Sequence, residues 1–160
     1  MCSSDLDLSL ELRIERLKLT FDLLVEIDLT ARPSYNREKF LAYDAFLCGW
    51  SLTHARYRAQ GTRPAVVFVS RDSHAALACA READELMTGR IGVMGASAEQ
   101  WYYAGRDHLF FAIESDIYRA ELTALALPAK PPGLRERLTG SGELALDRVN
   151  LLSDQHPRVT

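Results

Sequence analysis

The sequence predicts an α/β domain in which a mixed sheet begins with an N-terminal β-hairpin and is flanked by helices. Three observations indicate this class. Apolar and polar residues alternate over 8–14 and again over 17–30, which is the pattern of half-buried strands. The continuous apolar run AVVFV at 65–69 is typical of a strand covered on both faces. Segments with helical periodicity separate and follow these strands.

The chain has the size and composition of one globular domain. Its 160 residues are 48% hydrophobic and carry a net charge of −3, which is enough apolar material for a core. No apolar run approaches the ~18 to 20 residues of a spanning helix, and a signal-peptide pattern is missing, so we expect a cytoplasmic protein without a membrane partner. The slightly acidic balance argues against coating nucleic acid by bulk charge and leaves a local basic groove open.

Three segments are expected along the chain. The opening letters CSSDL match what a common sequencing-adapter end encodes when read in frame, so residues 1–6 are expected to be a non-native leader. Residues 7–127 are expected to form the α/β domain. The proline-rich stretch PAKPPG stands at 128–133, where proline disfavours regular structure, and residues 128–160 are expected to be this break followed by a disordered tail.

The hairpin is expected where the alternation changes phase, at residues 15–16. A two-residue turn there would pair Leu8 with Leu23 and would place apolar side chains opposite one another along both strands. In this register Asp7 lies diagonally adjacent to Glu26. The turn sequence Glu-Arg lacks the Asn-Gly or Asp-Gly chemistry of a favoured two-residue turn, so a longer loop or a bulge remains an alternative.

The first helix is expected after Pro33, which ends the second strand. Ser34 or Asn36 can cap this helix, which is expected to run to about Gln60, before Gly61. Its apolar and aromatic residues recur at spacings of three and four and predict one continuous stripe against the sheet: Phe40, Tyr43, Leu47, Trp50, His54 and Tyr57.

The chain then continues through the buried strand into a second helix. Asp72 or Ser73 can cap this helix, which is expected to run to about Thr88. A short strand is expected at 90–94. The order strand, helix, strand implies parallel pairing through a crossover connection.

The last expected elements follow a loop or short helical turn at 96–107. Residues 108–113 are expected to form another strand, and residues 114–127 a last helix. The proline-rich stretch stops that helix.

A carboxylate pair marks the end of the central alternating strand. Glu26 and Asp28 point to the same face because successive side chains of a strand alternate. Together with Asp7 they could bind a hard divalent cation, and Mg²⁺ is the natural candidate. Lys39 and Tyr43 lie one helical turn apart near the start of the first helix, which a short connection would hold close to these carboxylates.

A structural explanation of the same carboxylates stands beside the functional one. Glu26 and Asp28 could merely solvate an exposed sheet face, as acidic residues on alternating strands usually do. If they bind a metal ion instead, it can activate water and stabilise charge in phosphodiester cleavage. The candidate catalytic residues are then Glu26, Asp28, Lys39 and Tyr43, and the candidate metal ligands are Asp7, Glu26 and Asp28.

The order hairpin, acidic strand end, long helix and buried strand resembles the core of the PD-(D/E)xK nuclease-like superfamily. Within that superfamily, VEIDLT at 25–30 followed by KFLAY at 39–43 resembles the replication-relaxation family, with RPAVVFV at 63–69 as the succeeding core strand. The resemblance covers residues 7 to about 94. It implies a restriction-endonuclease-like core.

The resemblance also implies roles for individual residues. Asp7 would be the first metal-facing acid and Glu26 the second. Where the superfamily usually has a lysine two residues after the second acid, this chain has Asp28. Some members take the lysine from the following helix, which would make Lys39 the substitute.

Replication-relaxation proteins are associated with plasmids and mobile elements, often with a winged-helix DNA-binding segment upstream. The resemblance therefore implies DNA as a partner and a DNA-processing, nuclease-like role with Mg²⁺-dependent phosphodiester cleavage. The alternative is a non-catalytic DNA-binding or protein-interaction module on the same fold.

Overall fold

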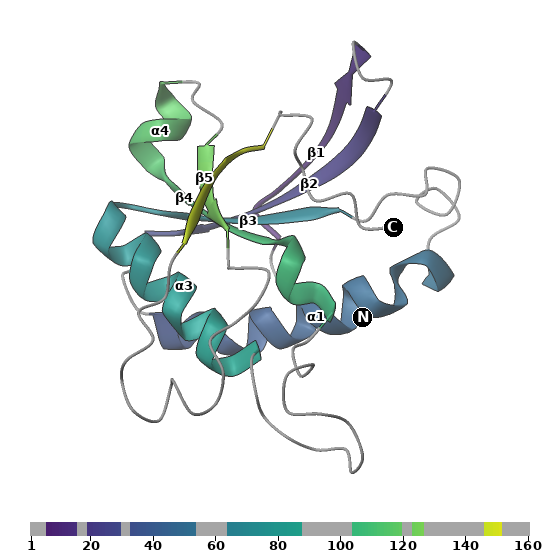
Figure 1. Ribbon diagram of the computed structural model, residues 1–160. Coiled ribbons are helices and arrows are strands. Elements are labelled where there is room, and N and C mark those ends of the chain that lie inside the picture. Colours follow the sequence, from purple (N-terminus) through teal and green to yellow (C-terminus); the bar gives the residue numbers. More distant parts are fainter. Residues whose placement is uncertain are drawn as a thin grey trace.

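A mixed six-stranded sheet forms the centre of the computed structural model (Figure 1). The structure describes residues 6–15, 19–29, 33–53, 64–87, 104–119, 123–126 and 146–151. The strands lie in the order in which they occur in the sequence, from β1 to β6. The elements are, in order, β1 (Leu8–Ile14), β2 (Leu19–Asp28), η2 (Pro33–Asn36), α1 (Arg37–Thr53), β3 (Ala65–Ser70), α3 (Ser73–Met87), η3 (Ala104–His108), β4 (Leu109–Ile113), α4 (Glu114–Tyr118), β5 (Thr123–Ala126) and β6 (Asp147–Asn150).

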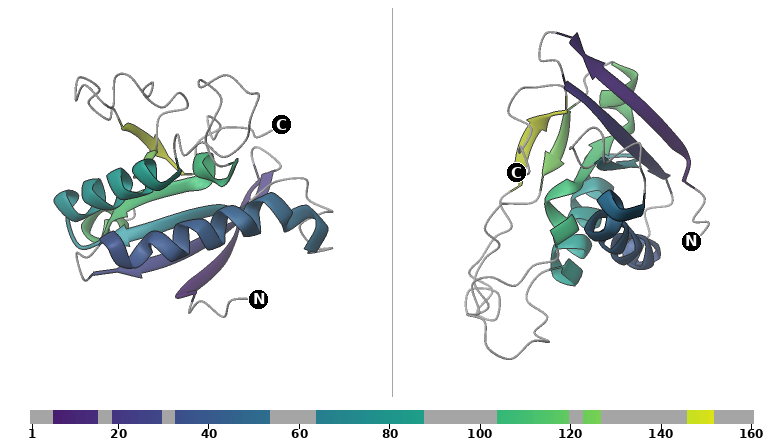
Figure 2. Two further views of the ribbon diagram at one scale, coloured as in Figure 1. Left: turned by 90° about the horizontal axis from the view of Figure 1, so that it is seen from below. Right: turned by 90° about the vertical axis from the view of Figure 1, so that its right-hand side faces the viewer.

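The expected α/β class is present, with parallel and antiparallel pairs in one sheet. Strands β2, β3 and β4 are parallel neighbours, whereas β1, β5 and β6 are joined to the sheet by antiparallel pairing. Every residue of β3 is buried, as its continuous apolar sequence predicts for a strand covered on both faces. Helices α1 and α3 lie together on one side of the sheet (Figure 2).

The N-terminal hairpin is present, but its register differs by two residues from the two-residue-turn prediction. Leu8 lies opposite Val25, rather than Leu23, and Ile14 lies opposite Leu19. Four residues, 15–18, therefore connect the strands. The Glu-Arg sequence does not suit the left-handed backbone of a two-residue turn. A shift of two residues keeps the same side chains on each face, so apolar residues still face apolar residues.

The core lies on both faces of the sheet. The core on the face toward α1 and α3 consists of Leu24, Phe40, Tyr43, Leu47, Val66, Phe68, Cys79, Ala80, Ala83, Leu86, Met87, Leu109 and Phe111. The core on the opposite face consists of Leu23, Val25, Ala65, Val67, Val69, Phe110, Ala112, Ala124 and Leu151. Burial of apolar surface on both faces supplies the main drive for folding.

Both long helices begin close to the expected positions. In α1 the first members of the predicted stripe, Phe40, Tyr43 and Leu47, are buried. The remaining stripe members lie outside the described side chains. Helix α3 is capped as expected, because the Asp72 carboxylate accepts a hydrogen bond of 2.9 Å from the Ala75 amide.

A buried ion pair fixes η3 between the two helices. The Arg106 guanidinium is fully buried and lies 2.7 Å from the carboxylate of Asp84 in α3. The Gly105 amide donates a hydrogen bond of 2.7 Å to Asp44 of α1. A Cβ on Gly105 would lie 2.8 Å from the backbone Cα of Asp44, so this approach requires glycine.

The C-terminal part differs most from the prediction. The helix expected over 114–127 ends at Tyr118, and residues 123–126 form β5 beside β4. The open edge of β4 offers main-chain partners that outweigh the helical propensity of the TALA sequence.

The tail expected over 128–160 is not disordered throughout, because residues 147–150 form β6, which pairs with β5. Buried Asp116 ties this strand to α4, since its carboxylate lies 2.5 Å from the Arg119 guanidinium and 2.7 Å from that of Arg148. The sheet thus extends past the expected domain end at 127. The strand expected at 90–94 lies outside the described residues. In the described part of the chain, no helix is long and apolar enough to cross a membrane.

We expect Asp84→Ala to lower the free energy of unfolding by about 3–5 kcal/mol, because it leaves the buried Arg106 charge without its closest counter-ion. Urea denaturation followed by circular dichroism measures the change. Asp116→Ala is the matched control. Its partners Arg119 and Arg148 have side chains 61% and 62% exposed, so water can solvate them. An equal loss in both variants would contradict the importance of the buried charge.

Candidate functional site

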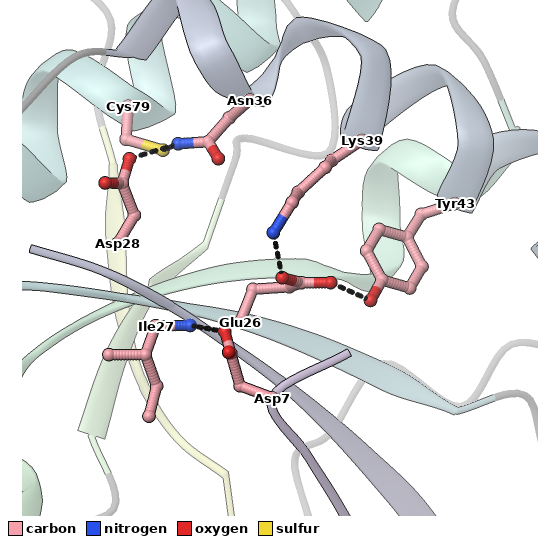
Figure 3. A network of polar contacts seen from close by, with 8 residues as sticks. All are labelled: Asp7, Glu26, Ile27, Asp28, Asn36, Lys39, Tyr43 and Cys79. Carbon is pink, nitrogen blue, oxygen red and sulfur yellow. Dashed lines mark hydrogen bonds and ion pairs between the residues drawn. The ribbon is translucent and has the colours of Figure 1, made fainter. Parts of the chain in front are cut away.

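A buried carboxylate at the end of β2 forms the centre of the site. Glu26 is 1% exposed, and its two carboxylate oxygens have different partners. The Lys39 ammonium binds Oε2, and the Tyr43 hydroxyl donates a hydrogen bond to Oε1 (Figure 3). Both partners come from α1, four residues apart, where side chains lie on the same helix face.

The sheet and α1 together determine where these groups lie. Glu26 lies opposite Phe68 of β3, so both side chains point toward the helices. The Tyr43 ring meets Phe68 edge to face, with centroids 6.1 Å apart and planes at 90°. Phe40, one turn earlier in α1, packs against the ring of Phe68, with ring centroids 4.9 Å apart. Such aromatic contacts favour one ring orientation, which directs the Tyr43 hydroxyl toward the carboxylate.

Tyr43 and Lys39 differ in how they are placed as donors to Glu26. Burial, followed by the hydrogen bond to Glu26 and the negative charges of Glu26 and Asp7, raises the pKa of Tyr43 far above its usual range. Tyr43 therefore remains a hydrogen-bond donor at physiological pH. The Lys39 side chain is 32% exposed, so its ammonium lies between the buried carboxylate and the solvent.

Asp7 joins the site from the residue that precedes β1. Its carboxylate accepts a hydrogen bond of 2.7 Å from the backbone amide of Ile27, the residue after Glu26. Figure 3 shows the Asp7 carboxylate on the opposite side of the β2 backbone from the helix, near the base of Glu26. The four-residue hairpin connection makes this approach direct, whereas the predicted register placed Asp7 only diagonally.

Asp28 belongs to a neighbouring group of polar side chains. The Asn36 amide donates a hydrogen bond of 2.6 Å to Asp28 and lies 3.6 Å from the Cys79 sulfur. Burial, followed by the charge of Asp28, raises the pKa of the Cys79 thiol to about 12, so this thiol stays protonated at neutral pH. Figure 3 shows Asp28 directed toward Asn36 and Cys79, and Glu26 directed toward Lys39 and Tyr43.

Of the five predicted site residues, the structure brings Glu26, Lys39 and Tyr43 into direct contact. It places Asp7 beside them at the Ile27 amide and directs Asp28 to Asn36. The expected approach of Lys39 to the carboxylates is present at Glu26. The alternative that Glu26 solvates an exposed face is wrong, because α1 covers that face. The sequence predicts Asn36 only as a helix cap and does not place Cys79 in this site. The spacing of three from Asn36 to Lys39 is the signal that could have placed Asn36 on the same helix side.

The donor set bears on the metal prediction. Among the described residues, no group of three or more His, Cys, Asp or Glu side chains is arranged to hold a metal ion. Asp7 and Glu26 nevertheless place two carboxylates at one strand end. Mg²⁺ commonly uses only one or two protein carboxylates and completes its coordination with water and substrate phosphates. By ligand type these two residues suit Mg²⁺, whereas the two Glu26 oxygens are bound to Lys39 and Tyr43 and Asp28 is hydrogen-bonded to Asn36.

We expect Tyr43→Phe to lower the free energy of unfolding by about 1.5–3 kcal/mol, because a buried carboxylate loses a hydrogen-bond donor. Urea denaturation measures this loss. Tyr118→Phe is the control, since Tyr118 is 82% exposed and its hydroxyl is solvated. A change in Tyr43→Phe no larger than in the control would contradict a stabilising bond to Glu26.

The raised pKa of Cys79 predicts a loss of stability at alkaline pH. The folded thiol holds its proton to a pKa of about 12, whereas the ordinary value is 9.0. The free energy of unfolding therefore keeps the full contribution of this thiol below pH 9. The contribution declines as the pH rises toward 12, because in this pH range the thiol ionises only in the unfolded chain. Between pH 8 and about 10.5, Cys79→Ser should lose less stability than the wild type. Parallel pH profiles of the two proteins would contradict this prediction.

Three comparisons of this chain with known proteins were made. A scan against protein-family models, a search of curated proteins and a search of solved structures each found no match. The likeness to the replication-relaxation family therefore rests on the motif residues of the sequence, and functional proposals rest on the site itself.

Proposed function

We propose that this chain is a nuclease-like, DNA-processing domain of a plasmid or mobile-element replication and relaxation protein, acting in the cytoplasm. The proposed reaction is metal-dependent hydrolysis of a phosphodiester on a restriction-endonuclease-like core. One observation carries the proposal. A buried acid at a strand end, Glu26, has a second acid beside it and a lysine from the next helix bound to it.

Asp7 and Glu26 are the residues that would hold Mg²⁺. When bound there, Mg²⁺ would supply charge stabilisation at the phosphate and would lower the pKa of a bound water. Asp7 is exposed, and its Oδ1 is not the atom that accepts the Ile27 hydrogen bond. Glu26 carries two oxygens with lone pairs beyond those that Lys39 and Tyr43 use.

Lys39 and Tyr43 have distinct roles in this proposal. The partly exposed Lys39 ammonium can bind a phosphate oxygen as well as Glu26, because an ammonium has three donors. It would orient the phosphate and stabilise its negative charge during water attack. Tyr43 keeps its proton and holds the Glu26 carboxylate in one orientation, so Tyr43 is a positioning residue.

The second candidate is a non-catalytic DNA-binding or protein-interaction module on the same fold. Two contacts favour it. Lys39 already compensates the charge of Glu26. Asp28, which stands where the superfamily usually has its lysine, is bound to Asn36. An ion-paired acid can stabilise a fold without performing chemistry.

Plasmid nicking in the presence of Mg²⁺ or Mn²⁺ separates the two candidates. We expect the wild type to nick DNA and Glu26→Gln to lose at least about 100-fold in rate, because a charged metal ligand becomes neutral. Lys39→Ala should lose about 100-fold as well, through missing charge stabilisation. Glu82→Gln is the matched control, since the ion-pair partner of Glu82 is Arg37 and not Lys39.

Metal titration by calorimetry completes this test. Mg²⁺ or Mn²⁺ should bind to the wild type and much more weakly to Glu26→Gln. If metal binding is identical in both proteins and the wild type does not nick DNA, the enzyme proposal is wrong. DNA binding without nicking would then favour the non-catalytic module.

A further inference from the structure

The outer edge of β1 is open for pairing with another strand. β1 is first in the strand order, and on its inner side it pairs with β2. In the ranges that the structure describes, no strand pairs with its outer side. The strand is seven residues long, LSLELRI, without proline or glycine. Figure 2 shows it at the outside of the sheet. Such an edge is a ready template for β-pairing with a second chain.

An exposed apolar face adjoins this edge. Leu8, Leu10 and Ile27 are 44%, 38% and 51% exposed. They share one face, because Leu8 lies opposite Val25 and Leu10 opposite Leu23, while Ile27 is two residues beyond Val25. Helices α1 and α3 cover the other face. Contiguous exposed apolar side chains of this kind mark interaction surfaces.

The charges of β1 indicate what pairs with it. Glu11 and Arg13 are exposed on the face opposite to the leucines. If β1 pairs antiparallel with the same strand of a second copy, and the two-fold axis passes at Leu12, each Glu11 lies opposite Arg13 of the second copy. Leu12 then lies opposite Leu12. Opposite charges at directly paired positions stabilise a sheet.

Other two-fold registers fit less well. The two-fold axis can pass at any residue of β1, and each such register keeps the apolar side chains of both copies on one face. Neighbouring registers differ by moving the axis by one residue. An axis at Glu11 would place two like charges directly opposite each other, which is destabilising. An axis at Leu10 would place Arg13 opposite Asp7, which precedes β1 and is held at the Ile27 amide of β2.

We propose that two copies of this chain form a symmetric dimer by antiparallel pairing of their β1 strands about Leu12, with reciprocal Glu11–Arg13 pairs. The interface is isologous, as in most closed dimers. It joins the two sheets edge to edge and brings the exposed leucines of both copies onto one continuous face. The dimer does not depend on the proposed nuclease activity, because Glu11 and Arg13 are not site residues.

Charge exchange tests both the dimer and its register. Glu11→Arg leaves arginines at both positions, and Arg13→Glu leaves glutamates at both, so each variant alone should be monomeric where the wild type is dimeric. Mixed together, the two variants should form a heterodimer, because every pair is again opposite in charge. The double variant Glu11→Arg/Arg13→Glu should form a homodimer. Sedimentation velocity at 10 to 100 μM, chosen to span weak association, measures each state.

The expected result is a dissociation constant at least about tenfold higher in each single variant, since two attractive pairs become repulsive, with recovery in the mixture and in the double variant. Circular dichroism verifies that each variant is folded, and the double variant decides the matter if a single variant is not. A monomeric wild type would overturn the dimer. Dimeric single variants, or no recovery in the mixture and the double variant, would overturn the proposed pairing.

Discussion

The burial of one carboxylate, Glu26, is the constraint on which the arrangement of β2 and α1 depends. An acid that is removed from water needs a counter-charge and hydrogen bonds, because an unpaired buried charge costs several kcal/mol. Lys39 and Tyr43 supply both from successive turns of α1. The helix must therefore cross β2 with these two positions over Glu26. The aromatic contacts of Phe68 with Phe40 and Tyr43 hold it there.

Further buried polar groups link the elements around this crossing. Asn36, at the end of η2, reaches Asp28 and Cys79, so the strand end, the helix start and α3 are linked by hydrogen bonds. One residue after Tyr43, the Asp44 carboxylate accepts a hydrogen bond from the Gly105 amide. The buried Arg106 guanidinium pairs with Asp84 of α3. Polar groups with partners on different elements specify one arrangement of those elements more narrowly than apolar contacts do.

The hairpin connects the site to the edge of the sheet. Its four-residue connection sets the register that brings Asp7 to the amide of Ile27. The same register sets Leu8 opposite Val25 and Leu10 opposite Leu23. The hairpin register thus determines which acid lies beside Glu26 and which residues of β1 lie opposite each residue of β2.

Local periodicity in the sequence was sufficient for much of this protein. It predicted the strands β1 and β2, the buried β3 and the shared face of Glu26 and Asp28, and residue type indicated Asp72 or Ser73 as the cap of α3, because these depend on neighbours along the chain. The spacing of Lys39 and Tyr43 placed them on one helix face for the same reason. The expectation of a half-buried β2 was wrong, since residues 22–26 are buried on both faces of the sheet. Only the tertiary structure decided which face of β2 the helices cover, and so that Glu26 is buried.

Tertiary contacts likewise decided that Asp28 accepts a hydrogen bond from Asn36, and that residues 123–126 and 147–150 are strands. Alternation shows which side chains share a face, but not what covers that face. A short segment such as TALA becomes a strand only when a partner edge is present. The physical reason is common to all these cases: hydrogen bonds and burial between residues distant in sequence outweigh the weak preferences of each segment alone.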